Sequence, residues 1–112
     1  MTVTTSPLRG SLFTLQDAQT TGNGEVIAIP DSFKRHTVII KGSSGVSAGG
    51  VQIETADAFD YMGTWGQIGG GEIDVEDDEE IVINFEGIFK FIRVRISTNV
   101  VGGTVTVLYV GS

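Results

Sequence analysis

Apolar and polar residues alternate along much of this chain, and two long stretches repeat the same pattern. The stretches span residues 36–55 and 91–109. Each has an alternating run rich in β-branched residues, then a patch of Ser, Thr, Gly or Asn that ends in Gly-Gly, and then a second alternating run. Alternation with a period of two is typical of a strand with one face inward, and glycine favours tight turns. The pattern therefore predicts a strand–turn–strand hairpin, used twice.

Shorter alternating runs predict further strands at residues 11–15, 25–29 and 81–85. The segment 56–71 contains too many glycines for a helix, since glycine costs about 1 kcal/mol at each helical position. We therefore expect an all-β fold of about seven or eight short strands without a substantial helix, built as an antiparallel β-sandwich that resembles a jelly roll. The expected organisation is an extended N-terminal arm at residues 1–10 and a single sandwich domain at residues 11–112.

The phase of the alternation also predicts which side chains point outward. In the strand that ends the first repeat, Val51 and Ile53 are expected to face the core, and Gln52 and Glu54 to face water. In the strand that begins the second repeat, Ile92, Val94 and Ile96 share the inner face. The arginines between them, Arg93 and Arg95, are expected on the opposite face.

Composition narrows the classes of function. The 112 residues include 14 acidic and seven basic side chains, which gives a net charge of −7, and no cysteine. Disulfides and thiolate metal sites are therefore excluded. A general electrostatic attraction to nucleic acid or to anionic lipid is not expected from an acidic chain. No stretch approaches the roughly 18 apolar residues of a membrane span, so we expect neither nucleic acid nor a membrane as a partner.

Catalytic and metal-binding patterns are weak. The one histidine, His36, lies at the mouth of a predicted strand and is expected on the surface, with no nucleophile motif beside it. The run 74–80 holds six carboxylates in seven positions. It lacks the glycine of a calcium loop, so a solvated loop is the first interpretation, a contact with a basic patch the second and a metal site the third. We expect no enzyme activity, no catalytic residue, no cofactor and no metal.

Aromatic and basic side chains remain as candidates for binding. Phe59, Tyr61 and Trp65 fall in the glycine-rich segment, where they could be core residues, interface anchors or a platform that stacks on sugar rings. Arg93 and Arg95 form the main basic cluster on a predicted strand. They could meet the acidic run 74–80, in the same chain or in a neighbour.

The second repeat, Phe91-Ile-Arg-Val-Arg-Ile-Ser-Thr-Asn-Val-Val-Gly-Gly-Thr-Val-Thr-Val, resembles small structural proteins of tailed-bacteriophage particles. Those chains often carry a segment of the type F-x-R-x-R-I-T…GGTVTV near their end. Upstream, Gly50-Val-Gln-Ile-Glu-Thr and Met62-Gly-Thr-Trp65 look like their G-T-V-T-I-E-x-S…G-T-W segment. The acidic run is a departure from that pattern. The resemblance covers roughly residues 36–110. Virion proteins of this size include capsid decoration (cement) proteins, neck or connector components and base domains of fibres.

The resemblance implies a non-enzymatic virion protein, made in the host cytoplasm and most simply a decoration protein that stabilises a phage head. A neck, tail or fibre-base component is one alternative, and a carbohydrate-binding module that uses Trp65 and Tyr61 is another. The implied partner is the major capsid protein or another virion protein, and a homo-oligomer is expected, with a trimer favoured. The residues expected to contact the capsid or a neighbouring subunit are Leu8, Arg9, Leu12, Phe59, Tyr61, Trp65, Arg93 and Arg95.

Overall fold

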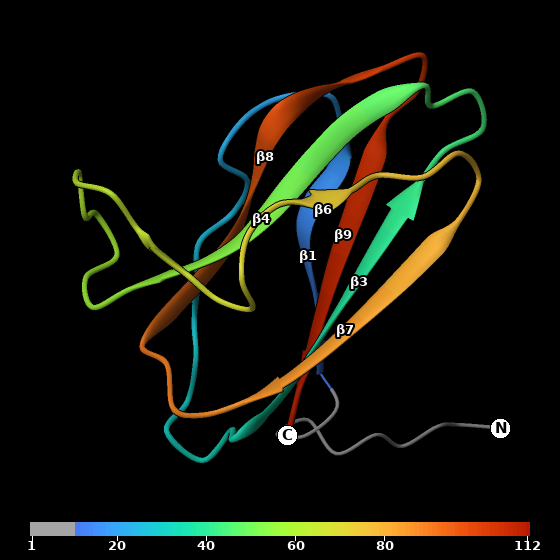
Figure 1. Cartoon of the computed structure of the whole chain (residues 1–112). Helices are drawn as coiled ribbons and strands as arrows, with labels where there is room; N and C mark the ends of the chain where they lie inside the picture. Colours follow the sequence, from blue (N-terminus) through green and yellow to red (C-terminus); the bar gives the residue numbers. More distant parts are fainter. Residues whose placement is uncertain (1–10) are drawn as a thin grey trace, which may run out of the picture.

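The structure is a computed structural model, and it describes residues 11–112 (Figure 1). These residues form two antiparallel sheets packed face to face, which confirms the predicted all-β sandwich. One sheet has the strand order β1-β9-β3-β7, and the other has the order β2-β8-β4-β5, with β6 paired to β4. The expected arm at residues 1–10, with Leu8 and Arg9, lies outside the described residues.

The described part of the chain contains nine strands rather than seven or eight, because three of them are only two residues long. The strands are β1 (Ser11–Gln19), β2 (Ile27–Ala28), β3 (Arg35–Gly42), β4 (Ala48–Ala56), β5 (Gly66–Gln67), β6 (Ile73–Asp74), β7 (Glu80–Glu86), β8 (Phe91–Val101) and β9 (Val105–Gly111). Among residues 11–112 the structure contains no helix that is both long and apolar enough to cross a membrane.

The two repeats are not hairpins, and that prediction is wrong. β3 and β4 lie in different sheets, and so do β8 and β9, so each repeat is an arch that crosses from one sheet to the other. The arches pair with each other instead: β3 pairs with β9 in one sheet and β4 pairs with β8 in the other. A hairpin and an arch share the same strand–turn–strand sequence pattern, so alternation alone does not distinguish them.

Glycine is required where the two arches meet. Gly45 and Gly102 both have positive φ, at 99° and 87°. A Cβ atom at Gly45 would lie 2.7 Å from the carbonyl oxygen of Gly102, and a Cβ at Gly102 would collide with the carbonyl oxygen of Gly45. Any other residue at either position would force the two crossings apart.

The core lies between the sheets and is lined by the inward side chains of both arches. Val38 and Ile40 from β3 and Val105, Val107 and Tyr109 from β9 are fully buried. The other sheet contributes a matching set, which consists of Val51 and Ile53 from β4 and Ile92, Val94 and Ile96 from β8. The inward positions predicted for these last two strands are therefore confirmed.

Candidate functional site

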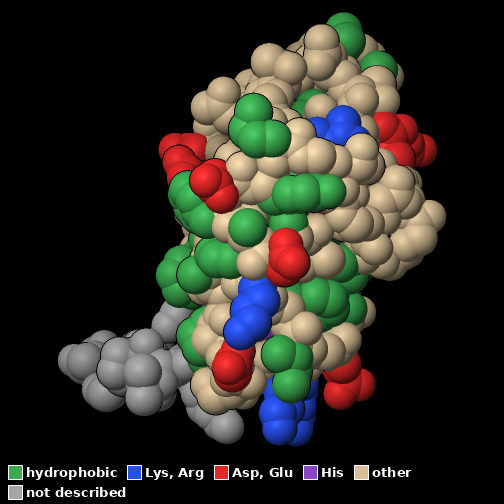
Figure 2. Space-filling model, turned by 90° about the vertical axis from the view of Figure 1, so that its left-hand side faces the viewer, with side chains coloured by type: hydrophobic (Ala, Val, Ile, Leu, Met, Phe, Trp, Pro, Cys, Tyr) green, Lys and Arg blue, Asp and Glu red, His purple; other side chains and the backbone are tan. Residues whose placement is uncertain are grey.

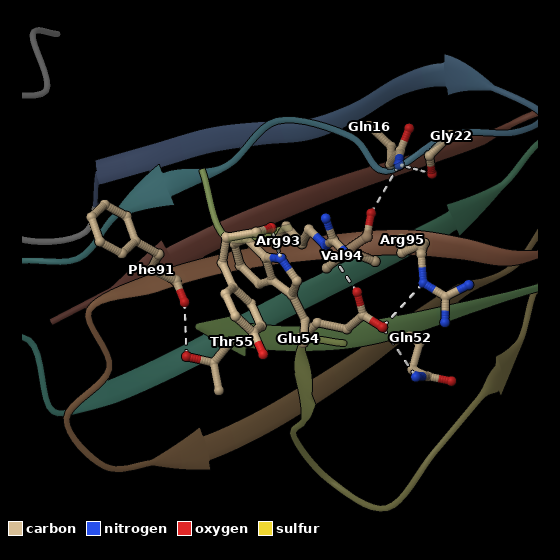
Figure 3. A network of polar contacts seen from close by, with 11 residues as sticks. Gln16, Gly22, Gln52, Glu54, Thr55, Phe91, Arg93, Val94 and Arg95 are labelled. Carbon is tan, nitrogen blue, oxygen red and sulfur yellow. Dashed lines mark hydrogen bonds and ion pairs between the residues drawn. The ribbon is translucent and has the colours of Figure 1, made fainter. Parts of the chain in front are cut away.

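Residues of the predicted partner-binding set come together on the outer face of β4 and β8. Glu54 in β4 stands opposite Arg93 in β8, and Gln52 stands opposite Arg95. The Nε atom of Arg93 donates a hydrogen bond to one carboxylate oxygen of Glu54 over 2.9 Å, and the Nε of Arg95 donates to the other over 3.1 Å. Figure 3 shows the carboxylate of Glu54 between the two arginines.

The placement of Glu54 corrects two expectations. The side chain of Glu54 is only 3% exposed, and Gln52 is also buried. The Nε2 atom of Gln52 donates a hydrogen bond to Glu54 over 3.2 Å. Neither residue faces water, because both arginines and the segment that follows β4 cover this face. The arginines pair with Glu54 and not with the acidic run 74–80.

Trp65 covers the network from outside. The guanidinium carbon of Arg93 lies 4.2 Å from the centre of the Trp65 ring, a cation–π contact. The indole Nε1 of Trp65 donates a hydrogen bond to the backbone oxygen of Tyr61 over 3.0 Å, which fixes the loop between β4 and β5. Trp65 is 3% exposed, so its ring has no free face for a sugar, which speaks against the sugar-platform alternative for this residue.

The loop that Trp65 holds carries three exposed apolar side chains at its end. Phe59 is 60% exposed, Tyr61 45% and Met62 95%, and we call these three residues the aromatic tip. The ring of Phe59 meets that of Phe91 edge to face, with 6.1 Å between centres. This loop projects from one side of the sandwich in Figure 1, and Figure 2 views that side. On that side of the molecule, hydrophobic side chains lie among acidic and basic ones (Figure 2).

The β7–β8 turn adds to this surface. Ile88 is 62% exposed, and residues 55–57 and 88–90 line one shallow hollow. Ile88 was missed by the sequence reasoning, because an apolar residue between Gly87 and Phe89 gives little sign that it is exposed. Leu12 is also exposed, but it lies in β1 of the opposite sheet, away from the aromatic tip. Its role as a contact residue stays a prediction.

His36 is buried, so the expected surface histidine is wrong. Its Nε2 lies 2.8 Å from the backbone oxygen of Gly87, which can only accept, so Nε2 carries the proton. Nδ1 therefore accepts a hydrogen bond from the hydroxyl of Tyr109 over 2.6 Å. The ring stacks on Phe85, with 5.1 Å between centres. Burial raises the pKa of Tyr109 to about 12. This arrangement joins β3, β9 and the end of β7 in the core.

The acidic run is tied to the first arch by several hydrogen bonds, among them the backbone bonds from Asp78 to Ser43 and from Gly42 to Glu79. The backbone N–H of Gly45 donates a hydrogen bond to Asp77 over 2.7 Å, and Val75 is buried in the core. The acidic side chains from Glu76 to Glu80 are exposed, as expected for a solvated loop. Within residues 11–112, no group of three or more His, Asp or Glu side chains is placed to hold a metal ion.

Glu72, just before the run, holds a separate contact with β8. Its carboxylate accepts hydrogen bonds from the hydroxyls of Ser97 and Thr98. These bonds, Ser97 first, hold the pKa of Glu72 below its usual value, and Arg95 adds a smaller effect in the same direction. The side chain is exposed, so we expect the contact to orient the segment before β6 rather than to stabilise the fold strongly.

Comparison with known proteins places the fold. A solved structure described as the crystal structure of SPBc2 prophage-derived protein YomS superimposes on this chain with a TM-score of 0.63, and the match covers 100% of both chains. The two chains share a fold. Their sequences are 18% identical, so the likeness extends to the architecture and not to particular residues. No family model matches this chain, and no curated protein matches it.

Proposed function

We propose that this chain is a non-enzymatic structural protein of a tailed-phage particle, and that it acts as a decoration protein on the capsid. The observation that carries the proposal is the fold shared over the full length of both chains with a prophage-derived protein. The likeness of residues 36–110 to small virion proteins supports the same origin. The shared fold covers the whole chain and so includes the segment that carries the sequence resemblance.

The aromatic tip is the surface that best fits a protein partner. Aromatic residues and methionine are enriched in interface cores, and Phe59, Tyr61 and Met62 are all exposed on one loop. Ile88 is exposed on the turn that shares a hollow with residues 55–57, at the start of that loop. The loop is held by Trp65 and the ion pairs below it. A contact surface that is already ordered loses less conformational entropy on binding than a free loop does. Repetition over a particle then converts modest contacts into high avidity.

The number of copies per particle tests this function. Quantitative mass spectrometry of purified particles, measured against the major capsid protein, is expected to find this chain in a copy number comparable to that of the shell subunits. A copy number that corresponds to a single ring of subunits would instead assign the protein to the neck, tail or fibre base. Absence from the particles would contradict the virion proposal altogether.

The aromatic tip is tested separately by replacing Phe59 and Met62 with Ser. Both side chains are exposed, so we expect the thermal midpoint to change little and the occupancy of stripped particles to fall by about tenfold or more. The matched control is Val101→Ser, which removes an exposed apolar side chain from the far end of β8. Equal occupancy of the double variant and the control would show that the tip is not the contact surface.

A further inference from the structure

β7 is an open edge of the four-stranded sheet. Within residues 11–112 it pairs with β3 on one side and with no strand on the other. The bond from the N–H of Gly42 to Glu79 O marks one end of the β3–β7 ladder, and the bond from the N–H of Gly87 to Lys34 O marks the other. Backbone groups alternate in direction along an antiparallel strand. The backbone groups of Val82 and Asn84 therefore point to the open edge, as do those of the strand's terminal residues.

The open edge leaves apolar surface partly uncovered. Ile81, Ile83 and Phe85 face inward and pack against the core, yet each is only partly buried. Val82, on the outer face, is 51% exposed. An extended segment added along β7 would cover part of these side chains while it satisfied the free backbone groups, which is how exposed sheet edges bind peptides.

Charge determines which segment fits. Glu80 and Glu86 lie at the two ends of β7, both exposed, and the acidic run leads directly into the first of them. The bases on this face, Lys41 and Arg35, lie one strand further in, on β3, opposite these glutamates. The outermost charges along the edge are therefore negative at both ends.

A second copy of β7 does not fit this edge. Antiparallel pairing of two β7 strands about Ile83 would place Glu80 of each copy against Glu86 of the other. Like charges directly opposite one another destabilise a strand pair. A segment with Lys or Arg at these two positions would be attracted at both ends.

We propose that the open edge of β7 docks an extended segment of another virion protein, with basic side chains opposite Glu80 and Glu86 and β-branched residues between them. Since the named partner is a virion protein, this inference rests on the proposed function. Docking adds a fifth strand to the β1-β9-β3-β7 sheet. It uses a surface distinct from the aromatic tip, so a particle subunit could be held at two places.

A short peptide tests the edge without any particle. The probe is Lys-Thr-Val-Thr-Val-Thr-Lys, whose two lysines have the spacing of Glu80 and Glu86, and its control carries Glu in place of both lysines. Amide exchange of the full chain is followed by NMR. We expect the lysine peptide to slow exchange at Val82 and Asn84, and the Glu peptide to bind about tenfold more weakly or worse. The difference between the peptides should shrink as salt is raised.

Variants of the edge complete the test. The N–H of Val82 faces the open edge and makes no hydrogen bond to β3, so Val82→Pro removes it without breaking the β3–β7 pairing. We expect this variant to bind the lysine peptide about tenfold more weakly. Val82→Thr keeps the N–H and should bind the peptide within about twofold of the parent. Should the proline variant fail to fold, Glu80→Gln with Glu86→Gln provides a second readout. That double variant should bind the two peptides equally, whereas Glu25→Gln, an exposed charge elsewhere, should keep the preference.

Two results would overturn the inference. One is an unchanged exchange rate at Val82 and Asn84 with either peptide. The other is protection of these amides in the free chain that disappears when residues 1–10 are deleted, because the chain's own N-terminal segment would then occupy the edge. Neither result bears on the copy number in particles. Conversely, absence of the chain from particles would contradict the proposed function, and the peptide measurement would still show whether the edge of β7 binds an extended segment.

Discussion

Glutamate has opposite surroundings in two regions of this molecule. On the outer face of β4 and β8, Glu54 is buried, receives hydrogen bonds from two arginines and is covered by a tryptophan. At the edge of β7, Glu80 is exposed, and its contact with Lys41 spans 3.7 Å between half-exposed side chains. The first arrangement uses charge to fix a loop within the chain. The second leaves the Glu80 side chain half in solvent, where the docking that we propose would use its charge. One small sandwich thus contains a glutamate fixed by its own chain and a glutamate that is largely solvated.

Removal of the two carboxylates should give the largest contrast. Glu54→Ala leaves two arginines without their partner in a largely desolvated site, and we expect a loss of about 3 kcal/mol in the free energy of unfolding. Glu80→Ala removes a solvated ion pair and should cost less than about 1 kcal/mol. Chemical denaturation of the two variants measures the difference. Equal losses would erase the distinction between the regions.

A smaller effect is expected when the basic partner of each glutamate is exchanged between arginine and lysine. Arg93→Lys keeps the charge but loses the planar group that both stacks on Trp65 and bonds to Glu54. We expect a loss of about 1–2 kcal/mol and a shift in the emission of the lone tryptophan. The matched change at the edge, Lys41→Arg, should leave both stability and emission as they are. A silent Arg93→Lys variant would mean that the stacked geometry contributes nothing.

The smallest effect at neutral pH concerns the core behind the β7 edge. Tyr109→Phe removes the hydroxyl that bonds to His36, at a cost of about 1 kcal/mol. The pH dependence of the free energy of unfolding tests Tyr109 more specifically than this loss does. Because the pKa of Tyr109 is raised to about 12 in the folded chain from 10 in the unfolded one, the neutral form stabilises the fold fully below pH 10.

That stabilisation is lost as the pH rises from about 10 to 12, since the unfolded chain releases the proton first. Unfolding curves at pH 9 and at pH 11 should therefore differ for the parent more than for Tyr109→Phe. The other tyrosine, Tyr61, is exposed and serves as the control, as Tyr61→Phe should keep the parent's difference. The same difference in all three proteins would contradict the assignment to Tyr109.

Alternation predicted the strands of this chain well because it is a local property. The inward rows of β4 and β8, with Val51 and Ile92 among them, follow directly from the period of two. The pairing of those strands is a non-local property, so the local pattern predicts hairpins where the structure has arches. Gly45 and Gly102 suited either interpretation, since both kinds of connection use positive φ.

Burial of polar residues was the harder part of the site to predict. Glu54 occupies an outward-facing position in β4, and side chains at such positions are normally exposed to water. Its partners Arg93 and Arg95 occupy the corresponding outward phase of the other repeat, and once the repeats are paired with each other the opposite charges meet. The signal was present in the sequence, but it required the pairing. His36 gave less warning, because its partners Tyr109 and Gly87 are distant in the chain and ordinary in type.

The most direct test of the whole account is a cryo-electron microscopy map of purified particles from the source of this chain. We expect sandwich-shaped density repeated over the outer surface of the shell, with the loop of Phe59, Tyr61 and Met62 against the shell subunits and an added strand along β7. A shell without that density would contradict the central claim that this protein decorates a capsid.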